Sequence, residues 1–274
     1  MQARRLSAAR GAFWLFEGFR LFRRNPPLIT ALTLVYLLIV QLLAALLPGI
    51  GPVVLPLLLP VMTLIVANGC RLVDQNRKPD KAGLLHGVTG NGTALLQLGG
   101  LQLLGAVLVI LLSMLLNDGN DPLSTPLTLP ETPNMGEGAT DTATQVADAA
   151  AQAAMLNALM KVLLIATPLI IAFWFAPFLV GWDRVSPAKS LFFSTVASFR
   201  NWRAMLMFSL AAVAVAGILP GFILIVIGQI SGMALGAALV ALRMILIFLV
   251  APILTASIYV SYRDIFHTGV DENA

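Results

Sequence analysis

Long apolar stretches dominate the pattern of hydrophobic and polar positions in this chain, and short segments with charged residues separate them. A transmembrane helix needs about 20 mainly apolar residues to cross the hydrocarbon layer. Windows of this kind occur six times, at 28–48, 53–73, 93–116, 156–181, 204–228 and 234–260. The pattern therefore predicts an all-α, polytopic membrane protein with six transmembrane helices.

The composition agrees with this class. Apolar residues make up 58% of the chain and charged residues only 11%, whereas soluble domains are about 25% charged. Because a soluble fold cannot bury so large an apolar excess, the excess must face lipid. We predict one membrane domain: an interfacial segment 1–27, the first three spans in 28–116, an acidic loop and helix in 117–155, the last three spans in 156–262 and a tail 263–274.

Among the segments that connect the spans, Lys and Arg occur only in alternate ones. The first 27 residues contain six arginines, and 71–92 and 182–203 contain four basic residues each. The segment 117–150 contains six carboxylates and no basic residue. Short cytoplasmic loops carry the excess of Lys and Arg. We therefore predict a multi-pass membrane protein with cytoplasmic N- and C-termini, a cytoplasmic tail and an extracytoplasmic acidic loop.

Residues 10–24 are predicted to form an amphipathic helix that lies along the membrane surface. At about 100° per residue, charged side chains share one narrow arc and apolar side chains cover the opposite face. The charged arc holds Arg10, Glu17, Arg20 and Arg24, and the apolar face holds Trp14, Leu15, Phe19, Leu21 and Phe22. Such a helix is too charged to span and too apolar for water, so the head-group plane suits it. Asn25 and the pair Pro26–Pro27 are predicted to end it.

A related order of residues recurs twice. "SLFFSTVASFRNWRAML" precedes the fifth span, and "AGLLHGVTGNGTALLQL" precedes the third as a weaker match, with Asn201 and Asn91 in the place of Asn25. This pattern favours three units, each an interfacial helix followed by a transmembrane hairpin. The alternative is that any chain obeying the charge rule shows basic segments at this rhythm.

The stretches "WLFEGFRLFRRNPPL" and "PFLVGWDRVSPAKSLFFSTVASFRNWRAM", together with the six-span layout, resemble an uncharacterised family of proteobacterial inner-membrane proteins. The resemblance covers most of the chain except 117–150, and it implies location and fold but no reaction. A fainter similarity connects the chain with the membrane domain of some glycerophosphodiester phosphodiesterases. These 274 residues contain no phosphodiesterase domain, so that activity is not implied.

The sequence contains no recognisable enzyme motif. His86 and His267 are the only histidines and lie in different segments, and Cys70 is the only cysteine. There is no GxxxxGK[ST] phosphate-binding loop and no GxSxG nucleophile elbow. We therefore expect no enzymatic activity, no cofactor and no metal site.

Arg243 is the candidate functional residue within a span, in "ALVALRMILIFLV". An arginine at the centre of a transmembrane helix costs about 2.5–3.5 kcal/mol on insertion scales. No carboxylate is expected at its depth, so carbonyls, Gln41, Gln97, Gln102 or an external anion remain as partners. Its side chain either reaches the outer interface or faces the bundle interior as an anion or head-group site.

Two functions remain open at this point. The first is a non-enzymatic protein that organises lipids or partner proteins through interfacial helices, and the alternative is a permease or channel for a small solute or anion. The residues expected to bind lipid or anions are Arg243, Arg20, Arg23, Arg24 and Trp14. Membrane lipids, anionic ones above all, are the expected partners. Nucleic acid is not, because the arginines adjoin spans and no recognition motif accompanies them. The sequence specifies neither a protein partner nor an oligomeric state.

The acidic segment divides in two. Residues 117–138 are rich in Pro, Gly, Asp and Thr and are predicted to be irregular and mobile. Residues 139–155 have high helix propensity and are predicted to form a helix that leads into the fourth span.

The topology can be tested with reporter fusions. A reporter fused after Asp264 should be active on the cytoplasmic side, and one inserted within 125–135 should be active outside, because basic connections stay in the cytoplasm. Paired reporters that function in opposite compartments measure this. Identical compartments for both insertion points would exclude the predicted topology.

Overall fold

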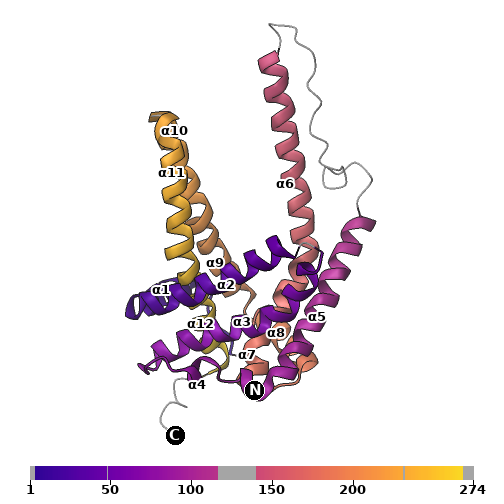
Figure 1. Ribbon diagram of the computed structural model, residues 1–274, viewed down its shortest axis with the longest axis vertical. Coiled ribbons are helices and arrows are strands. Elements are labelled where there is room, and N and C mark those ends of the chain that lie inside the picture. The colour runs from indigo at the N-terminus through magenta and orange to yellow at the C-terminus, as the bar shows by residue number, and fades with distance from the viewer. Residues whose placement is uncertain (1–3, 48, 117–139, 231, 268–274) are drawn as a thin grey trace. The chain divides into compact units, whose positions relative to one another are not determined.

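The structure is a computed structural model that describes residues 4–47, 49–116, 140–230 and 232–267. Within these ranges the ordered elements are helices, and no strand is present. Figure 1 shows their arrangement. In chain order they are α1 (Ala9–Arg24), α2 (Pro26–Leu46), α3 (Gly51–Asp74), α4 (Lys81–Leu84), α5 (Val88–Leu115), α6 (Thr140–Phe173), α7 (Ala176–Gly181), α8 (Pro187–Arg200), α9 (Trp202–Val213), η1 (Ala214–Ile218), α10 (Leu219–Ile230), α11 (Gly232–Ile245), η2 (Leu246–Val250) and α12 (Ala251–Phe266).

The six predicted spans are confirmed. In the part of the chain that the structure describes, six helical stretches are long and apolar enough to cross a membrane. They are Pro26–Leu46, Gly51–Asp74, Lys81–Leu115, Met155–Gly181, Trp202–Ile230 and Gly236–Phe266. Each contains or closely overlaps one predicted window. The all-α, six-span fold class therefore follows from hydropathy alone.

The chain forms two compact units, which are described separately. The first unit comprises residues 1–101 and 172–274, and the second comprises residues 102–171. Within the second unit, α5 meets α6 closely at Gly105, where an added Cβ would overlap the Leu169 side chain. The candidate site lies entirely in the first unit. That the whole chain acts as one membrane domain stays a prediction.

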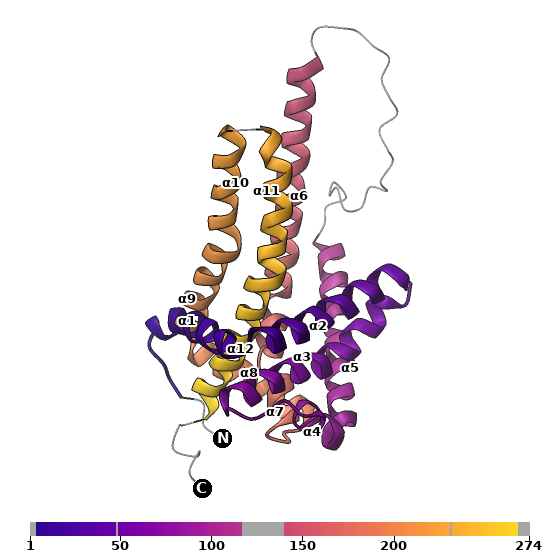
Figure 2. The same cartoon turned by 60° about the vertical axis from the view of Figure 1, so that its left-hand side comes forward.

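Within the first unit, α1 packs against α9 and α12, as Figures 1 and 2 both show. Two glycines of α1 permit the close approach. A Cβ on Gly11 would overlap the Ala204 carbonyl of α9, and a Cβ on Gly18 would overlap the Ser257 hydroxyl of α12. The helix therefore contacts protein along one face over most of its length.

The predicted helix at 10–24 is confirmed as α1, and it ends where Asn25 was expected to end it. Asn25 has a non-helical φ of −150°, and its side-chain oxygen accepts a hydrogen bond from the Leu28 N–H at 3.3 Å. Asn91 and Asn201 also have non-helical backbone angles, with φ of −128° and −111°. All three asparagines thus lie at breaks that precede a span.

The helices before the third and fifth spans differ. Before the fifth span, α8 is a separate helix of 14 residues, as the repeat predicts. Before the third span only α4 forms, with four residues. Gly87 follows it with a φ of 78°, a conformation that glycine adopts without steric cost. The glycine-rich sequence therefore gives a turn at this position in place of a surface helix.

Prolines in the last two spans coincide with π-helical segments. Both η1 and η2 end one residue before the helix that carries a proline at its second position, Pro220 in α10 and Pro252 in α12. Proline has no N–H and its ring crowds the carbonyl four residues earlier. The wider π turn relieves that crowding while the helix continues. Figure 2 shows α10 and α11 running side by side beyond these segments.

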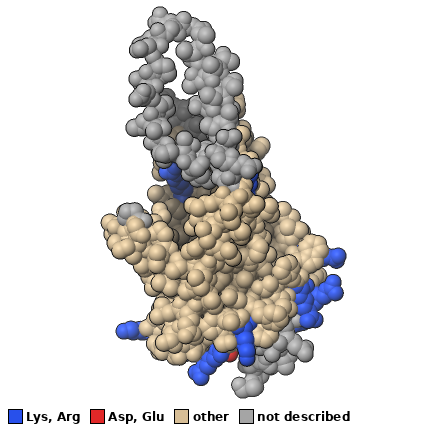
Figure 3. All heavy atoms as spheres, turned by 90° about the vertical axis from the view of Figure 1, so that its right-hand side faces the viewer, with Lys and Arg blue, Asp and Glu red and all other residues tan. Residues whose placement is uncertain are grey.

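The predicted helix at 139–155 is confirmed from Thr140 onward, since α6 runs without interruption into the fourth span. The predicted irregular segment 117–138 lies outside the described residues. On the face drawn in Figure 3, Lys and Arg lie in a few groups, and broad areas between them carry no charged side chain. This separation is what charged residues confined to the ends of spans produce.

Gly99 and Gly100 on α5 give a matched test of the packing between spans. A Cβ at Gly99 would lie 2.6 Å from the Leu57 Cα and carbonyl oxygen on α3, whereas a Cβ at Gly100 would meet nothing within 4 Å. We expect Gly99→Ala to destabilise the protein by about 1–3 kcal/mol, because backbone cannot move aside easily. Gly100→Ala should be neutral or stabilising by roughly 0.5–1 kcal/mol. Thermal unfolding of both variants in detergent measures the difference; equal melting temperatures would contradict the helix contact.

Candidate functional site

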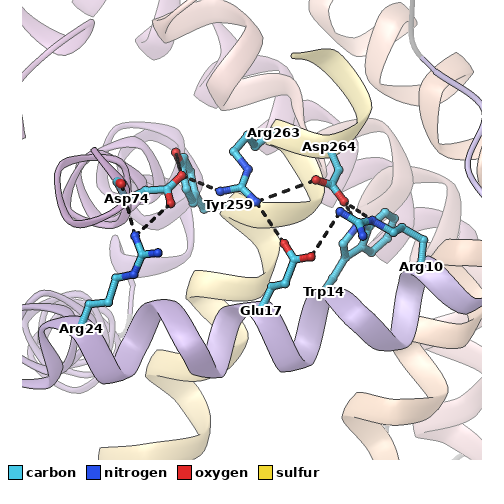
Figure 4. Close-up of polar contacts among 8 residues, drawn as sticks. All are labelled: Arg10, Trp14, Glu17, Arg24, Asp74, Tyr259, Arg263 and Asp264. Atoms are coloured by element: carbon cyan, nitrogen blue, oxygen red, sulfur yellow. Dashed lines mark hydrogen bonds and ion pairs between the residues drawn. The ribbon is translucent and has the colours of Figure 1, made fainter. Parts of the chain in front are cut away.

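A network of ion pairs joins α1, α3 and α12 in the first unit, as Figure 4 shows. Arg263 of α12 lies at its centre. Its Nη1 donates to Asp74 Oδ2 of α3 at 2.6 Å, and its Nη2 donates to Glu17 Oε2 of α1 at 3.0 Å. One guanidinium therefore bridges carboxylates from the first and third helices of the fold, which are far from it in sequence.

The other end of α1 is fixed through Asp264. The Arg10 Nε donates to Asp264 Oδ2 at 2.7 Å, and a second nitrogen of Arg10 lies 3.2 Å from Glu17 Oε1. The hydrogen bond to Asp264 raises the pKa of Arg10. Trp14 Nε1 donates to the same Asp264 oxygen at 3.0 Å. Two donors from α1 therefore converge on one carboxylate of α12.

Trp14 does not lie where the sequence predicts it. The sequence predicts it on a lipid-facing surface, but it is 0% exposed and packs edge-on against Phe208 of α9, with ring centroids 6.1 Å apart. The reason is that α9 and α12 cover this face of α1, so the indole contacts protein. Its N–H meets the usual requirement that a buried indole find a hydrogen-bond partner. Trp14 is thus a residue that positions α1 in the fold.

Arg24 and Tyr259 complete the network around Asp74. Arg24 Nη1 lies 3.7 Å from Asp74 Oδ1, and the Tyr259 hydroxyl donates to Asp74 Oδ2 at 3.0 Å. Three arginines and three carboxylates take part in the network, so its formal charges cancel. They are Arg10, Arg24 and Arg263 with Glu17, Asp74 and Asp264. A polar cavity of about 240 Å³ adjoins it, and Arg20 contributes to its wall.

The remaining face of α1 is exposed and combines aromatic with basic side chains. Phe13, Phe16 and Phe19 are 54%, 57% and 37% exposed. Arg20 and Arg23 are exposed beside them, and the Arg23 guanidinium lies 5.8 Å from the centre of the Phe19 ring. We call these five residues the α1 stripe. No ion pair engages its arginines within the described part of the chain.

A second surface of the same kind lies on α8. Phe192, Val196 and Phe199 are 64%, 43% and 63% exposed, and Lys189 and Arg200 are exposed on the same helix. These five residues form the α8 stripe. The opposite face of α8 is buried and consists of small residues, Ser190, Ser194, Ala197 and Ser198. Both helices thus contact protein on one face and expose phenylalanine with basic residues on the other.

Arg243 lies apart from these groups. Its side chain is exposed on α11, and no hydrogen bond or ion pair connects it with any residue that the structure describes. The structure therefore does not bring it together with Arg20, Arg23 or Arg24. The three glutamines considered as its partners do not contact it by hydrogen bonds either.

Another polar cluster, not expected from the sequence, fixes the ends of α3 and α7. Asn68 of α3 is 1% exposed, and its amide donates to the carbonyl oxygens of Leu84 at 2.9 Å and His86 at 2.8 Å. Its oxygen accepts a hydrogen bond from Trp182 Nε1 at 2.8 Å. Nearby, burial raises the pKa of the Asp183 carboxyl, although the Tyr262 hydroxyl donates to it.

Sequence reasoning identified one half of the ion-pair network and missed the other. Arg10 and Glu17 were recognised on one arc of α1, but their partners on α12 lie about 250 positions away. The available signal was the placement of Asp74 and the pair Arg263–Asp264 at the ends of spans, where uncompensated charge is costly. Among the described residues, no group of three or more His, Cys, Asp or Glu is placed to hold a metal ion.

The fold and this site define a six-span membrane protein whose first helix is held against the bundle by a neutral ion-pair network. The sequence is 32% identical over 279 aligned residues to a probable inner membrane protein of Burkholderia thailandensis, covering 99% of this chain and 96% of that protein. The chain therefore belongs to the same family of inner-membrane proteins, as the resemblance predicted, and is a multi-pass member. No family model and no solved structure matches it.

Arg263 gives the sharpest test of the network. We expect Arg263→Lys to lower the stability by about 1 kcal/mol, because a single ammonium group cannot bond Asp74 and Glu17 in two directions as a guanidinium does. Arg263→Met should cost about 2 kcal/mol or more, since it leaves carboxylates unpaired. Thermal unfolding in detergent measures both.

The compensating change is Glu17→Gln, which should recover part of the loss in the Arg263→Met protein by removing one of the unpaired charges. Arg5→Met, at an exposed position before α1, is the control and should leave the melting temperature unchanged. A wild-type melting temperature for Arg263→Met would contradict the central role of this residue.

Proposed function

We propose that the protein is a non-enzymatic inner-membrane protein that organises anionic lipids at the membrane surface through α1 and α8. The observation that carries this proposal is the pair of stripes. Two helices outside the spans each expose two or three large apolar side chains beside basic ones. Exposed apolar surface of this kind marks an interaction site, and the basic residues select a negatively charged partner.

The energies favour a location in the head-group layer. Burying an exposed phenylalanine contributes about 1.5–3 kcal/mol, so the three phenylalanines of the α1 stripe have a strong preference for leaving water. Each arginine adds about 1 kcal/mol near an anionic leaflet. An arginine whose stem lies along apolar surface can keep its head group in the polar layer. The Arg23 guanidinium lies over the Phe19 ring, so the two side chains can occupy the boundary between apolar and polar layers together.

The ion-pair network supports this role by fixing the orientation of α1. Arg10 and Glu17 are engaged with α12, and Trp14 is buried, so the helix cannot turn its buried face outward without breaking these contacts. The α1 stripe is therefore presented in a constant orientation. A surface held in this way orders the lipids around it at a lower entropic cost than a mobile segment does.

The alternative is a permease or channel for a small solute or anion. The π segments before Pro220 and Pro252 and the exposed Arg243 favour it. A permeation path requires polar groups along the spans. Two charged cavities among the described residues of the first unit, one beside Arg24 and one beside Arg71, lie at the ends of spans. The lipid-organising function therefore has the stronger support.

The test uses the full-length protein reconstituted in bilayers that mix phosphatidylcholine and phosphatidylglycerol. The lipids retained after mild detergent extraction are identified by mass spectrometry. We expect the wild-type protein to retain phosphatidylglycerol selectively. In Arg20→Glu/Arg23→Glu the selectivity should fall by more than about tenfold, because two attractive charges become repulsive.

The control is Arg4→Glu/Arg5→Glu, which changes the net charge equally at exposed positions outside α1. It should retain most of the selectivity. Equal losses in the two double variants would show a general charge effect and contradict a specific α1 surface. Rapid solute flux in the same liposomes, abolished by Arg243→Leu, would favour the permease.

A further inference from the structure

A second cavity, of about 260 Å³, lies where α3 ends and the chain turns into α4. It is distinct from the cavity beside the ion-pair network and from both stripes. Its wall includes Arg71, Gln75, Arg77, Asp80 and His86. Since α3 is a transmembrane span, the cavity lies at the end of a span, at the depth where lipid head groups are found.

The arginines of this cavity differ from those of the network. Arg10, Arg24 and Arg263 each pair with a carboxylate within 4 Å. Arg71 and Arg77 form no ion pair with any residue in the described ranges, although both line the cavity. An additional arginine, Arg184, lies within electrostatic reach of the His86 ring together with these two. The cavity wall therefore combines two arginines, neither of which forms an ion pair among the described residues, with the carboxylate of Asp80.

Arg71 is held in place by a rigid support. Its guanidinium lies 5.2 Å from the centre of the Trp182 ring, and the Trp182 N–H is bonded to Asn68. Asn68 donates its amide hydrogens to the carbonyl oxygens of Leu84 and His86, so it also fixes the backbone at His86, which lines the cavity. A cation stacked on an aromatic ring keeps its N–H groups available for an anion. The arrangement is preorganised, which lowers the cost of binding.

Asp80 restricts the kind of anion that fits. Its Oδ1 accepts a hydrogen bond from the Gly83 N–H at 3.1 Å, and the carboxylate remains at the cavity wall. It disfavours a doubly charged phosphate and favours a singly charged phosphodiester that carries a hydrogen-bond donor. Phospholipids with ethanolamine or glycerol head groups have both features, and basic pockets at span ends are known to bind lipid head groups.

We propose that this cavity is a binding site for the phosphodiester head group of one phospholipid, with Arg71 and Arg77 on the phosphate and Asp80 accepting a hydrogen bond from its ammonium or hydroxyl group. This site goes beyond the surface role of α1 and α8 and does not depend on it. It binds a single lipid in a defined position, whereas the stripes act on many.

The test is native mass spectrometry of the delipidated full-length protein in detergent. The protein is titrated separately with phosphatidylglycerol, phosphatidylethanolamine, phosphatidylcholine and sodium phosphate. We expect one tightly bound phosphatidylglycerol or phosphatidylethanolamine and weaker binding of phosphatidylcholine, whose ammonium has no N–H. Arg77→Gln and Arg71→Gln/Arg77→Gln should each weaken the binding by about tenfold or more, because a charge-assisted hydrogen bond is lost.

Lys78→Gln is the matched control, since it removes the same charge at the adjacent exposed residue, which does not line the cavity. The double variant Arg20→Glu/Arg23→Glu alters the α1 stripe but not this cavity, so it distinguishes the site from the proposed function. It should bind the single lipid normally. Arg77 donates to the Leu72 carbonyl through its backbone, so replacing its side chain preserves the turn. Unchanged lipid binding in Arg77→Gln, or an equal loss in Lys78→Gln, would overturn the site. Tight binding of sodium phosphate that competes with the lipids would overturn its assignment to phospholipid.

Discussion

The bridge that Arg263 makes between Asp74 and Glu17 is the interaction on which the first unit depends. It connects the end of the last span to the end of the second span and to the helix that precedes the first. Charges beside a hydrocarbon layer are costly unless they are compensated. The carboxylates around Arg263 compensate the arginines, so α1, α3 and α12 can meet at this boundary. The close glycine contacts of α1 bring this helix near enough to form the ion pairs.

Charge is distributed in two distinct ways in this molecule. Where helices must be held together, arginines are paired and their formal charges cancel. Where the molecule meets its surroundings, arginines such as Arg20, Arg23 and Arg77 have no carboxylate partner among the described residues, and phenylalanine or tryptophan accompanies several of them. The paired arginines hold helices together, and the arginines without a carboxylate partner are available to bind an anion. This division is the physical basis of our proposal that membrane lipid is the partner of this protein.

The sequence predicts the spans well because hydropathy is a local property that needs no knowledge of tertiary contacts. It also locates the break at Asn25, because asparagine and proline act on the backbone beside them. It fails for Trp14. Periodicity shows which residues share a face of α1, but it does not show whether lipid or protein covers that face. Asp264 and Phe208, which contact Trp14, are distant from it in sequence, and no local pattern indicates such partners.

The same reasoning explains why the cavity beside Arg71 was not expected. Its support is a chain of contacts from Arg71 through Trp182 to Asn68, which connects two residues of α3 through a tryptophan that lies 114 positions from Asn68. Taken alone, Asn68 is one polar residue in an apolar helix, and most such residues bond to a neighbouring helix. Only the fold shows that its partners are the turn at His86 and the indole on which Arg71 stacks.

The contact between Trp14 and Asp264 also has a consequence for biogenesis. The two residues are 250 positions apart, so α1 leaves the ribosome long before α12 exists. At about 5–20 residues per second, this delay lasts on the order of tens of seconds. During that time Arg10, Trp14 and Glu17 have no α12 to bind, so α1 lacks one of the helices that it packs against in the folded protein. On the proposed function, the phenylalanines and arginines of the α1 stripe would hold the nascent helix at the bilayer surface until α12 is synthesised and binds it.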